Sequence, residues 1–367
     1  MQGNELSDKN GRGKERPWKK HKTGNQKVID LLYILKDLDK AHRIEQCGNL
    51  LEFGQCPNGH GKWLKGAHFC QLRVCLLCVW RKFLFTYLQF LQIAHKVIDT
   101  HPNTQFIFIT LTIRNCELDK LSEAFTHMNK SFAKFVKYKR IKEAYKGFFK
   151  SIETTYNPET NTFHPHIHCV VAVNKKYFKG EQYLNFNELQ SFWKKALKVK
   201  YDPDCDVRKV RPKRWKGINT VNKEILLMDK ELMNQAIAAG GAEAAKYSVK
   251  VNDIINPTIW KEDSFEMREA KLRLAKDPQW QAEVLDYLMR GIENRQLIGY
   301  TGIFRDAYKS LNCTDVEQSD LINMPGEEPV CRCKICQSEL VQLHYVWNGK
   351  GYFEKSHKIT HNKIKVA

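Results

Sequence analysis

Hydrophobic runs long enough to form buried strands lie in the middle of the chain. Residues 104–114 (TQFIFITLTIR) are mostly β-branched and aromatic and contain no turn residue, and similar runs occupy residues 147–156 and 163–173. Such runs predict strands. The segment between the last two runs, NPETNT, has the Asn, Pro and Thr of a turn, so we expect these two strands to form a hairpin.

Apolar residues at helical spacing predict helices around these strands. The helices that bear on the fold are predicted over residues 28–43, 79–98, 118–138 and 186–199, and a more polar fourth strand over 205–210. From residue 104 to residue 210 the order is therefore strand, helix, strand, strand, helix, strand. This order predicts an α+β fold, with a ferredoxin-like or RRM-like antiparallel sheet that has two helices on one face and an open second face.

Three histidines alternate along the strand predicted over residues 163–173. Alternate side chains of a strand share a face, so His164, His166 and His168 should point the same way, and the following CVVAV should anchor the strand in a core. Glu153 is the only carboxylate of the preceding strand. The hairpin would bring Glu153 beside His166 and His168, which predicts a divalent metal site. The alternative is that these histidines are half-exposed polar residues at a strand start.

Two clusters of cysteines predict zinc sites, because clustered cysteines in a reducing compartment favour metal binding over disulfides. The first is a small zinc-binding region that precedes the sheet. Its expected ligands are Cys47, Cys70, Cys75 and Cys78, with Cys56 and His60 as alternatives for the same site. The CxxC spacing of Cys75 and Cys78 suits one tetrahedral zinc ion. The alternative for this region is a set of buried or free thiols.

A second zinc site is expected near the end of the chain. Its candidate ligands are Cys331, Cys333 and Cys336, with a fourth ligand to come from Cys313, His344, His357 or His361. The CxC and CxxC spacings are typical of a metal site, but no candidate for the fourth ligand stands out.

The charge of the chain points to a polyanionic partner. Among 367 residues there are 60 Lys and Arg against 41 Asp and Glu, a formal net charge of +19, which favours nucleic acid. Arg211, Lys213 and Arg214 lie in a basic stretch that also contains a Trp, and they are DNA-binding candidates. No apolar run approaches the roughly 20 residues of a membrane span, and the N-terminus lacks a signal-peptide core. We therefore expect a cytoplasmic protein.

These patterns divide the chain into five regions. In order, we expect a disordered basic arm, a helical and Cys-rich zinc-binding region, a catalytic domain, a helical extension and a C-terminal Cys-containing segment, over residues 1–26, 27–100, 104–255, 256–312 and 313–367.

A tyrosine near the end of the expected catalytic domain is a candidate nucleophile. Residues 224–251 are predicted to be helical with a break at a Gly pair, and Glu243 and Tyr247 lie four residues apart on one face. Lys246 and Lys250 flank the tyrosine and are further DNA-binding candidates. A tyrosine oxygen can act as a nucleophile when nearby cations favour its anion. The alternative is a packing residue on an Ala-rich helix.

Three of these motifs together resemble those of a known superfamily. TLTIRN (110–115), HPHIHCVV (164–171) and EAAKYSVK (243–250) resemble, in this order, the three motifs of HUH endonucleases. The chain resembles more closely the replication initiator proteins of bacterial rolling-circle plasmids, in the branch with a single catalytic tyrosine. The upstream segments CGNLLEF (47–53) and FCQLRVCLLCVWR (69–81) also resemble that branch. The resemblance extends over roughly residues 40–310.

The resemblance implies a role for each of five residues. His166 and His168 match the metal-ligand pair, Glu153 matches the acidic third ligand, Tyr247 matches the nucleophile, and Glu243 matches a glutamate that activates water in the terminating step. It also implies an HUH endonuclease core that uses Mg²⁺ or Mn²⁺. The implied activity is nicking of the plasmid's double-strand origin, single-stranded or extruded at the nick site, through a 5′-phosphotyrosine. The freed 3′-OH would prime rolling-circle replication, with a host helicase and polymerase as implied partners.

Two alternatives stay open at this point. One is an HUH transposase or relaxase with the same chemistry, although relaxases usually carry three histidine ligands. The other is a non-enzymatic zinc-containing protein that binds RNA or DNA by stacking bases on its sheet. The predicted strands lack the aromatic-rich motif that such a sheet would use.

Overall fold

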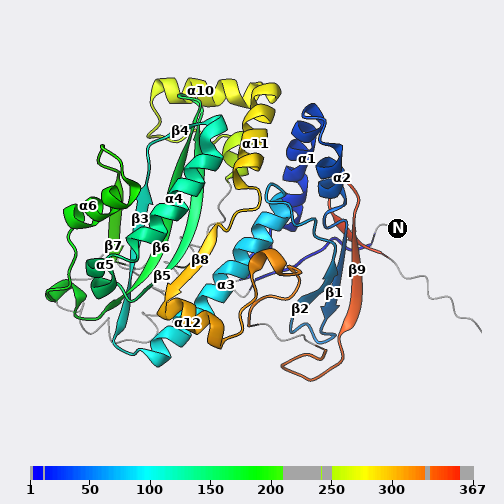
Figure 1. Cartoon of the computed structure of the whole chain (residues 1–367). Helices are drawn as coiled ribbons and strands as arrows, with labels where there is room; N and C mark the ends of the chain where they lie inside the picture. The colour runs from blue at the N-terminus through cyan, green and yellow to red at the C-terminus, as the bar shows by residue number, and fades with distance from the viewer. Residues whose placement is uncertain (1–2, 11–12, 210–240, 242–249, 327–330, 356–367) are drawn as a thin grey trace, which may run out of the picture.

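Two antiparallel sheets organise the protein. The computed structural model describes residues 3–10, 13–209, 241, 250–326 and 331–355. In this part of the chain a six-stranded sheet has the order β7-β3-β6-β5-β8, with β4 also paired to β6, and a four-stranded sheet has the order β10-β9-β1-β2. The long helix α3 lies between them (Figure 1). The expectation of an α+β fold with antiparallel strands is confirmed.

The larger sheet contains the strands that the hydrophobic runs predict. Its strands are β3 (Thr104–Thr112), β4 (Cys116–Glu117), β5 (Gly147–Asn157), β6 (Thr162–Asn174), β7 (Cys205–Lys209) and β8 (Ile298–Gly302). The predicted hairpin is the pair β5 and β6, in which Asn157 faces Thr162 across the turn. Because β5 and β6 are long and buried, the middle of this sheet is a rigid support for side chains.

Helices α4 and α6 pack together on one face of this sheet, as expected. They span Leu121–Phe135 and Phe186–Leu197, with η1 (Leu118–Lys120), α5 (Lys139–Ala144) and η2 (Tyr177–Lys179) in the connections. Phe135 contacts the indole of Trp193 edge-on at 5.9 Å between ring centroids, and Phe132 contacts Phe148 of β5 at 5.5 Å. A capping box formed by Asn185 and Glu188 starts α6.

The second face of the sheet is not open along its whole length. Helices α3 (Leu76–Thr100) and α12 (Ile303–Ser310) cover one end of it, where Phe90 and Phe304 pack against Phe149 and Val170. Val170 follows His166 and His168 on the same face of β6, so the face changes from polar to apolar along the strand. The apolar half needs a cover, and this is why the prediction of a fully open face is wrong.

The smaller sheet joins the two ends of the chain. It consists of β1 (Leu50–Gln55), β2 (Lys62–Ala67), β9 (Val341–Trp347) and β10 (Tyr352–Glu354), and β9 pairs with β1 so that Tyr345 faces Leu51. The C-terminal segment and the Cys-rich region are therefore parts of one unit, although the sequence places them in separate regions.

The N-terminal helices differ from the prediction. The helix expected over residues 28–43 is two helices, α1 (Trp18–Ile34) and α2 (Leu38–Gln46), separated at Lys36, which has a positive φ of 59°. Helix α1 begins inside the expected disordered arm, and Trp18 is 2% exposed with its ring 4.7 Å from that of Trp80. The arm prediction is wrong for these residues because this one large aromatic side chain secures a mostly polar segment to the core.

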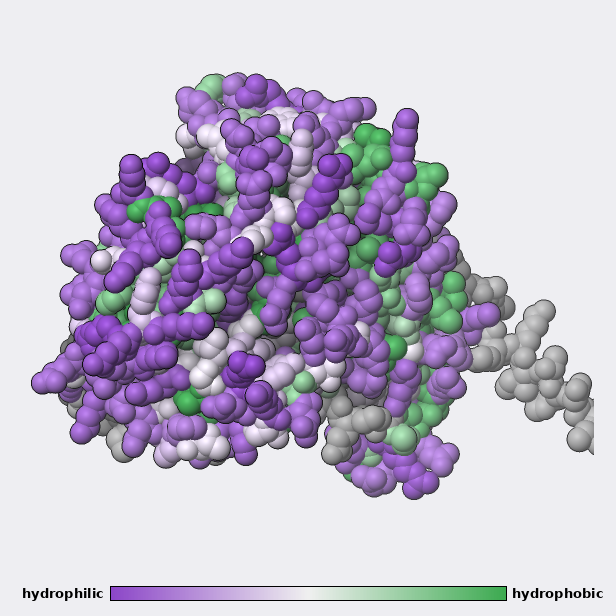
Figure 2. Space-filling model, in the orientation of Figure 1, coloured by the Kyte–Doolittle hydropathy of each residue, from purple (hydrophilic) through white to green (hydrophobic). Residues whose placement is uncertain are grey.

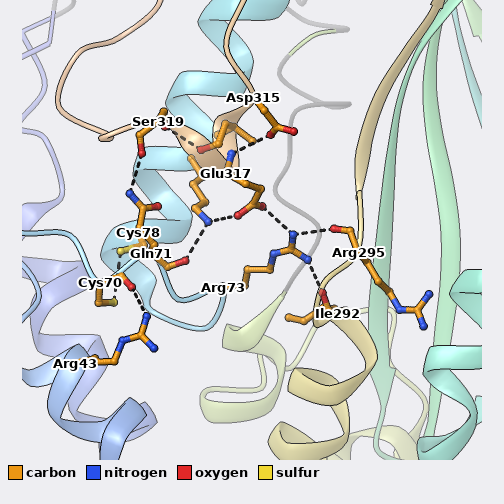
Figure 3. A network of polar contacts seen from close by, with 12 residues as sticks. Arg43, Cys70, Gln71, Arg73, Cys78, Ile292, Arg295, Asp315, Glu317 and Ser319 are labelled. Carbon is orange, nitrogen blue, oxygen red and sulfur yellow. Dashed lines mark hydrogen bonds and ion pairs between the residues drawn. The ribbon is translucent and has the colours of Figure 1, made fainter.

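The helices after residue 250 lead to the last strand of the larger sheet. Helices α9 (Val251–Ile255), α10 (Phe265–Lys276) and α11 (Pro278–Ile292) lead back to β8, which pairs with β5. The short helix η5 (Val316–Gln318) then returns to α3. There Glu317 forms ion pairs with Arg73 and with Lys82, whose side chain is 1% exposed (Figure 3). The expected helical extension thus supplies β8 to the sheet, and the start of the C-terminal segment supports α3 through Glu317.

The visible surface in Figure 2 is mostly hydrophilic, with hydrophobic residues gathered near α1 and α2. Tyr33, Ile34 and Leu38 are exposed there. Among the described helices, none combines the length and the apolar character that a membrane crossing requires.

Candidate active site

The strand register brings the three predicted metal ligands together. In the antiparallel ladder, Glu153 of β5 lies directly opposite His166 of β6, and His168 lies two residues further along the same face. The Nε2 atoms of His168 and His166 lie 3.3 Å and 3.8 Å from Glu153 Oε2. Each of the three residues offers a ligand atom within 4.8 Å of the others. The hairpin thus builds a compact two-histidine, one-carboxylate group.

The other ring nitrogen of each histidine is held by a neighbour. His166 Nδ1 lies 3.2 Å from the carbonyl oxygen of His164, which can only accept, so this nitrogen donates. His168 Nδ1 lies 3.2 Å from Oγ1 of Thr110 on β3. Such contacts orient a ligating imidazole and leave Nε2 free for a metal. Thr110 lies directly opposite His168 in the pairing of β3 with β6, so this contact depends on a strand pairing that residue spacing does not predict.

Glu153 is a buried carboxylate with an unusual environment. Its side chain is 1% exposed, and neither oxygen has a hydrogen bond of normal geometry in the described part of the chain. Lys250 forms an ion pair with Oε1. Burial would favour the neutral acid, but the contacts with His166 and His168 and the charge of Lys250 outweigh it and hold the pKa of Glu153 below its usual range.

The donor set fits a divalent cation. Lys250 pairs with Oε1 of the buried carboxylate, and Oε2 lies toward the two imidazoles, so a cation between Oε2 and the imidazole nitrogens would compensate the rest of its charge. Two imidazoles and one carboxylate are ligands that Mn²⁺ and related divalent ions accept. His164 is not part of the group, because its Nδ1 lies 2.7 Å from Asn115 Oδ1. The residues that could hold the metal are therefore Glu153, His166 and His168.

The candidate nucleophile lies outside the described residues. This holds for Tyr247, Glu243, Lys246, Arg211, Lys213 and Arg214. Two described residues flank the segment that contains the tyrosine. Lys250 contacts Glu153, and Gly241 is buried so closely against α3 that a Cβ there would lie 2.4 Å from Cδ1 of Phe90. Lys250, expected as a DNA contact, is thus placed at the metal-ligand group.

The first predicted zinc cluster also comes together. Cys47, Cys70, Cys75 and Cys78 are all buried, and neighbouring sulfur atoms lie 3.5–3.6 Å apart. Bonds of about 2.3 Å to a tetrahedral zinc ion would set its ligand sulfurs about 3.8 Å apart. The convergence of these four residues is confirmed, and the arrangement is compatible with zinc.

The second predicted cluster has a different membership. Cys333 and Cys336 meet Cys56 and His60, which the sequence suggested only as alternatives for the first site. Cys331 is exposed and lies outside the group. Of the expected fourth ligands, His344 lies beside Glu52, Cys313 is not in the group, and His357 and His361 are outside the described residues. The prediction holds for Cys333 and Cys336 but is wrong for Cys331 and for the fourth ligand, because the partners of Cys333 come from a strand pairing between distant segments.

Comparison with known proteins decides the family. The family model described as replication protein (Rep_1) matches residues 61–353, which is most of the chain. The chain belongs to this family. The match covers the metal-ligand hairpin, three of the four residues of the first cysteine cluster and two of the four of the second, and it confirms the resemblance to plasmid replication initiators.

Individual relatives agree with this assignment. The chain is 32% identical to a "Protein rep" of Bacillus amyloliquefaciens over 88% of this chain and 90% of the relative. It is 34% identical to a "Protein rep" of a Bacillus species, over 83% and 89% of the two chains. A "Protein rep" of Streptococcus pneumoniae is 28% identical over 96% of each chain. No solved structure gives a significant match.

Proposed function

We propose that this replication protein initiates rolling-circle replication by nicking the double-strand origin of its plasmid in the cytoplasm. Tyr247 would attack a phosphodiester of single-stranded or extruded DNA. The Tyr oxygen forms a bond to phosphorus, the bond from phosphorus to the 3′ oxygen breaks, and that oxygen takes a proton. The products are a 5′-phosphotyrosine and a 3′-OH that primes synthesis. One phosphodiester replaces another, so no ATP is required.

The observation that carries this proposal is the convergence of Glu153, His166 and His168 on adjacent strands in a member of the replication protein family. The sheet supports it as well. Strands β3, β5, β6 and β7 are the first to fourth strands of its central unit along the chain. Across the sheet they lie in the order β7-β3-β6-β5, that is, fourth, first, third, second. This is the strand order of a ferredoxin-like βαββαβ unit, the fold expected for an HUH core.

The metal group would serve the reaction as follows. A bound Mg²⁺ or Mn²⁺ would supply Lewis-acid stabilisation of charge on the phosphate oxygens. Glu153, His166 and His168 would hold it, and the contact of His168 with Thr110 would keep the imidazole oriented. The rigid β5–β6 hairpin keeps these ligands fixed, which is what precise positioning of a phosphate needs.

Chain connectivity supports Tyr247 as the nucleophile. Tyr247 precedes Lys250 by three residues, and three residues of chain span at most about 11 Å. Lys250 contacts Glu153, so the backbone of the tyrosine is tethered to the metal-ligand group. Lys250 would also contribute positive charge beside the scissile phosphate. Glu243 would activate water for the terminating cleavage, in place of a second tyrosine.

Origin recognition would rest on the basic surplus and on the zinc-binding region. Arg211, Lys213, Arg214 and Lys246 are the candidate DNA contacts, because phosphate binding depends on Lys and Arg. A host helicase and polymerase would act after nicking. The four-cysteine cluster would hold structural zinc and fix the start of α3.

The test is nicking of end-labelled origin DNA in the presence of Mn²⁺ or EDTA. We expect wild type to give a free 3′-OH product and a blocked 5′ end with Mn²⁺ only, and Tyr247→Phe to bind the DNA without nicking it. Tyr33→Phe, on the exposed side of α1, is the matched control and should nick normally. Binding without nicking by wild type would favour a non-enzymatic nucleic-acid-binding protein. Nicking of a transposon end or transfer origin in preference would favour the transposase or relaxase alternative.

A further inference from the structure

Two tight turns from opposite ends of the sequence present four metal-ligating side chains to one another. The first turn follows β1, and in it the Cys56 amide donates to Gly61 O while the Gly59 amide donates to Cys56 O, each at 3.0 Å. The second turn precedes β9, and in it the Cys333 amide donates to Ser338 O at 2.9 Å and the Gln337 amide to Cys333 O at 2.8 Å. Each turn therefore offers a pair of ligands: Cys56 with His60, and Cys333 with Cys336.

The distances between the ligand atoms fit a tetrahedral ion. Cys56 Sγ lies 3.5 Å from Cys336 Sγ, and His60 Nδ1 lies 3.6 Å from the sulfurs of both Cys56 and Cys333. Bonds of about 2.3 Å to sulfur and 2.1 Å to nitrogen around zinc would give ligand separations of about 3.6–3.8 Å. A disulfide would need sulfurs about 2.05 Å apart and gives His60 no role. The geometry matches metal coordination and not a disulfide.

The polar neighbours of Cys336 Sγ favour the thiolate form of this sulfur. Asn58 Nδ2 donates to Cys336 Sγ at 3.3 Å, and Ser338 Oγ lies 3.3 Å from the same sulfur. Outer contacts of this kind stabilise a metal-bound thiolate. A metal cation bound between the ligands would itself balance the negative charge of the thiolates.

The strand β9, which follows this cluster, has limited apolar packing, because Leu343 and Trp347 are only partly buried against the core. Among the seven residues of β9 only Tyr345 is buried, and the strand pairs with β1 more than 280 residues away in the sequence. Closing so long a loop is entropically unfavourable, and one buried and two partly buried apolar side chains offset only part of that cost. A metal site contributes its binding free energy directly to folding.

We propose that Cys56, His60, Cys333 and Cys336 bind a structural zinc ion that joins the C-terminal segment to the β1–β2 hairpin. This site is separate from the four-cysteine cluster, whose ligands all come from residues 47–78. It differs from the site that cysteine spacing suggests, because Cys331 takes no part. The inference does not rest on the nicking activity.

The test is the zinc content of purified full-length protein, measured per chain for a set of variants. Cys56→Ser and Cys333→Ser should each contain about one zinc ion less than wild type. Cys331→Ser is the matched control, since it removes a cysteine two residues from Cys333, and it should keep the wild-type content. Metal bound elsewhere is common to all four proteins and cancels in the comparison. Equal zinc in wild type and Cys56→Ser, or an equal loss in Cys331→Ser, would overturn the proposal.

A second measurement decides the matter if the serine variants do not fold. His60→Cys keeps four ligands and should remain folded with the wild-type metal content. After replacement of zinc by Co²⁺, the exchange of nitrogen for sulfur should strengthen and shift the thiolate-to-cobalt absorption bands relative to wild type. An unchanged spectrum in a cobalt-loaded His60→Cys protein would show that residue 60 is not a ligand.

Discussion

At the scale of single residues, the central feature is a carboxylate that is buried and yet kept ionised. Glu153 lies beside two imidazoles and Lys250, and these contacts hold its pKa below the usual range in spite of burial. The carboxylate is therefore charged at every pH at which the protein would act. A metal ion could therefore bind the carboxylate and the two oriented imidazole nitrogens without first displacing a proton from Glu153.

We predict that Glu153→Gln weakens Mn²⁺ binding by at least about tenfold, because loss of even an outer partner of a metal site typically lowers affinity 10–100-fold. Electron paramagnetic resonance titration of free Mn²⁺ measures this. Glu159→Gln, in the exposed turn of the same hairpin, is the control and should bind as wild type does. Equal affinities in Glu153→Gln and wild type would remove Glu153 from the ligand set.

The ammonium of Lys150 gives the stability of the protein a pH dependence that results from burial and not from a charged partner. Burial lowers the pKa of Lys150 to about 8, with its ammonium 4.9 Å from the ring centroid of Phe132. The unfolded chain has the normal pKa near 10.4, so between about pH 8 and 10.4 the unfolded state binds more protons, and stability rises with pH in that window.

The measurement is chemical denaturation of wild type and Lys150→Met at pH 7.5 and pH 10. From pH 7.5 to pH 10, the free energy of unfolding of wild type minus that of the variant should increase by on the order of 2 kcal/mol. Other groups that titrate there are present in both proteins and cancel. A constant difference between the two proteins would mean that Lys150 has its ordinary pKa in the folded state.

At the scale of elements, the pairing of strands decides what the sequence can and cannot predict. Strand β6 and its partner β5 are contiguous in sequence, so alternation and a turn signal were enough to place Glu153 opposite His166. The ligands Cys56 and Cys333 belong to segments that meet only because β9 pairs with β1. Local spacing carries no information on such a pairing, so it predicted Cys331 as a ligand and missed Cys56 and His60 as partners of Cys333 and Cys336. The strands β1, β2, β9 and β10 are short and half-exposed, and their hydrophobic pattern is weak.

The contact between Gly241 and α3 leads to a prediction at this scale. Phe90 is fully buried between Phe149 and Phe304, so its ring has little room to yield to a Cβ at residue 241. Gly241→Ala should therefore destabilise the protein, by roughly 1–3 kcal/mol as for other overpacked cores, and should slow nicking more than it weakens DNA binding. Thermal unfolding and nicking rates measure the two effects.

A compensating change tests the cause. Phe90→Leu makes space beside residue 241, so Gly241→Ala combined with Phe90→Leu should be less destabilised than the sum of the two single variants. Additive effects would show that the clash with Phe90 is not the reason for the loss.

At the scale of the whole molecule, α3 joins the two sheets. It starts at the four-cysteine cluster, runs between the sheets and covers the apolar half of the histidine face (Figure 1). Its buried Lys82 is held by Glu317, which also pairs with Arg73, whose guanidinium reaches the carbonyl oxygens of Ile292 and Arg295 (Figure 3). The four-cysteine cluster, α3 and the end of α11 are thereby connected through one carboxylate.

Removal of that carboxylate should destabilise the whole fold. Glu317→Gln leaves the ammonium of Lys82 buried without its counter-charge, which we expect to lower the free energy of unfolding by about 3 kcal/mol. Glu262→Gln, an exposed glutamate ahead of α10, is the control and should change it by less than about 0.5 kcal/mol. Denaturation by urea measures both. Equal stability of Glu317→Gln and wild type would mean that the carboxylate of Glu317 is not what stabilises the buried ammonium of Lys82.

We propose that Tyr247 makes the covalent bond to DNA beside the group formed by Glu153, His166 and His168. The most direct measurement is to trap the protein on single-stranded origin DNA with Mn²⁺, digest the denatured adduct and locate the attached nucleotide by mass spectrometry. We predict that the nucleotide is linked through a 5′ phosphate to the peptide that contains Tyr247, and that no adduct forms with EDTA. Attachment to any other residue, or an adduct that forms equally well without metal, would contradict the account.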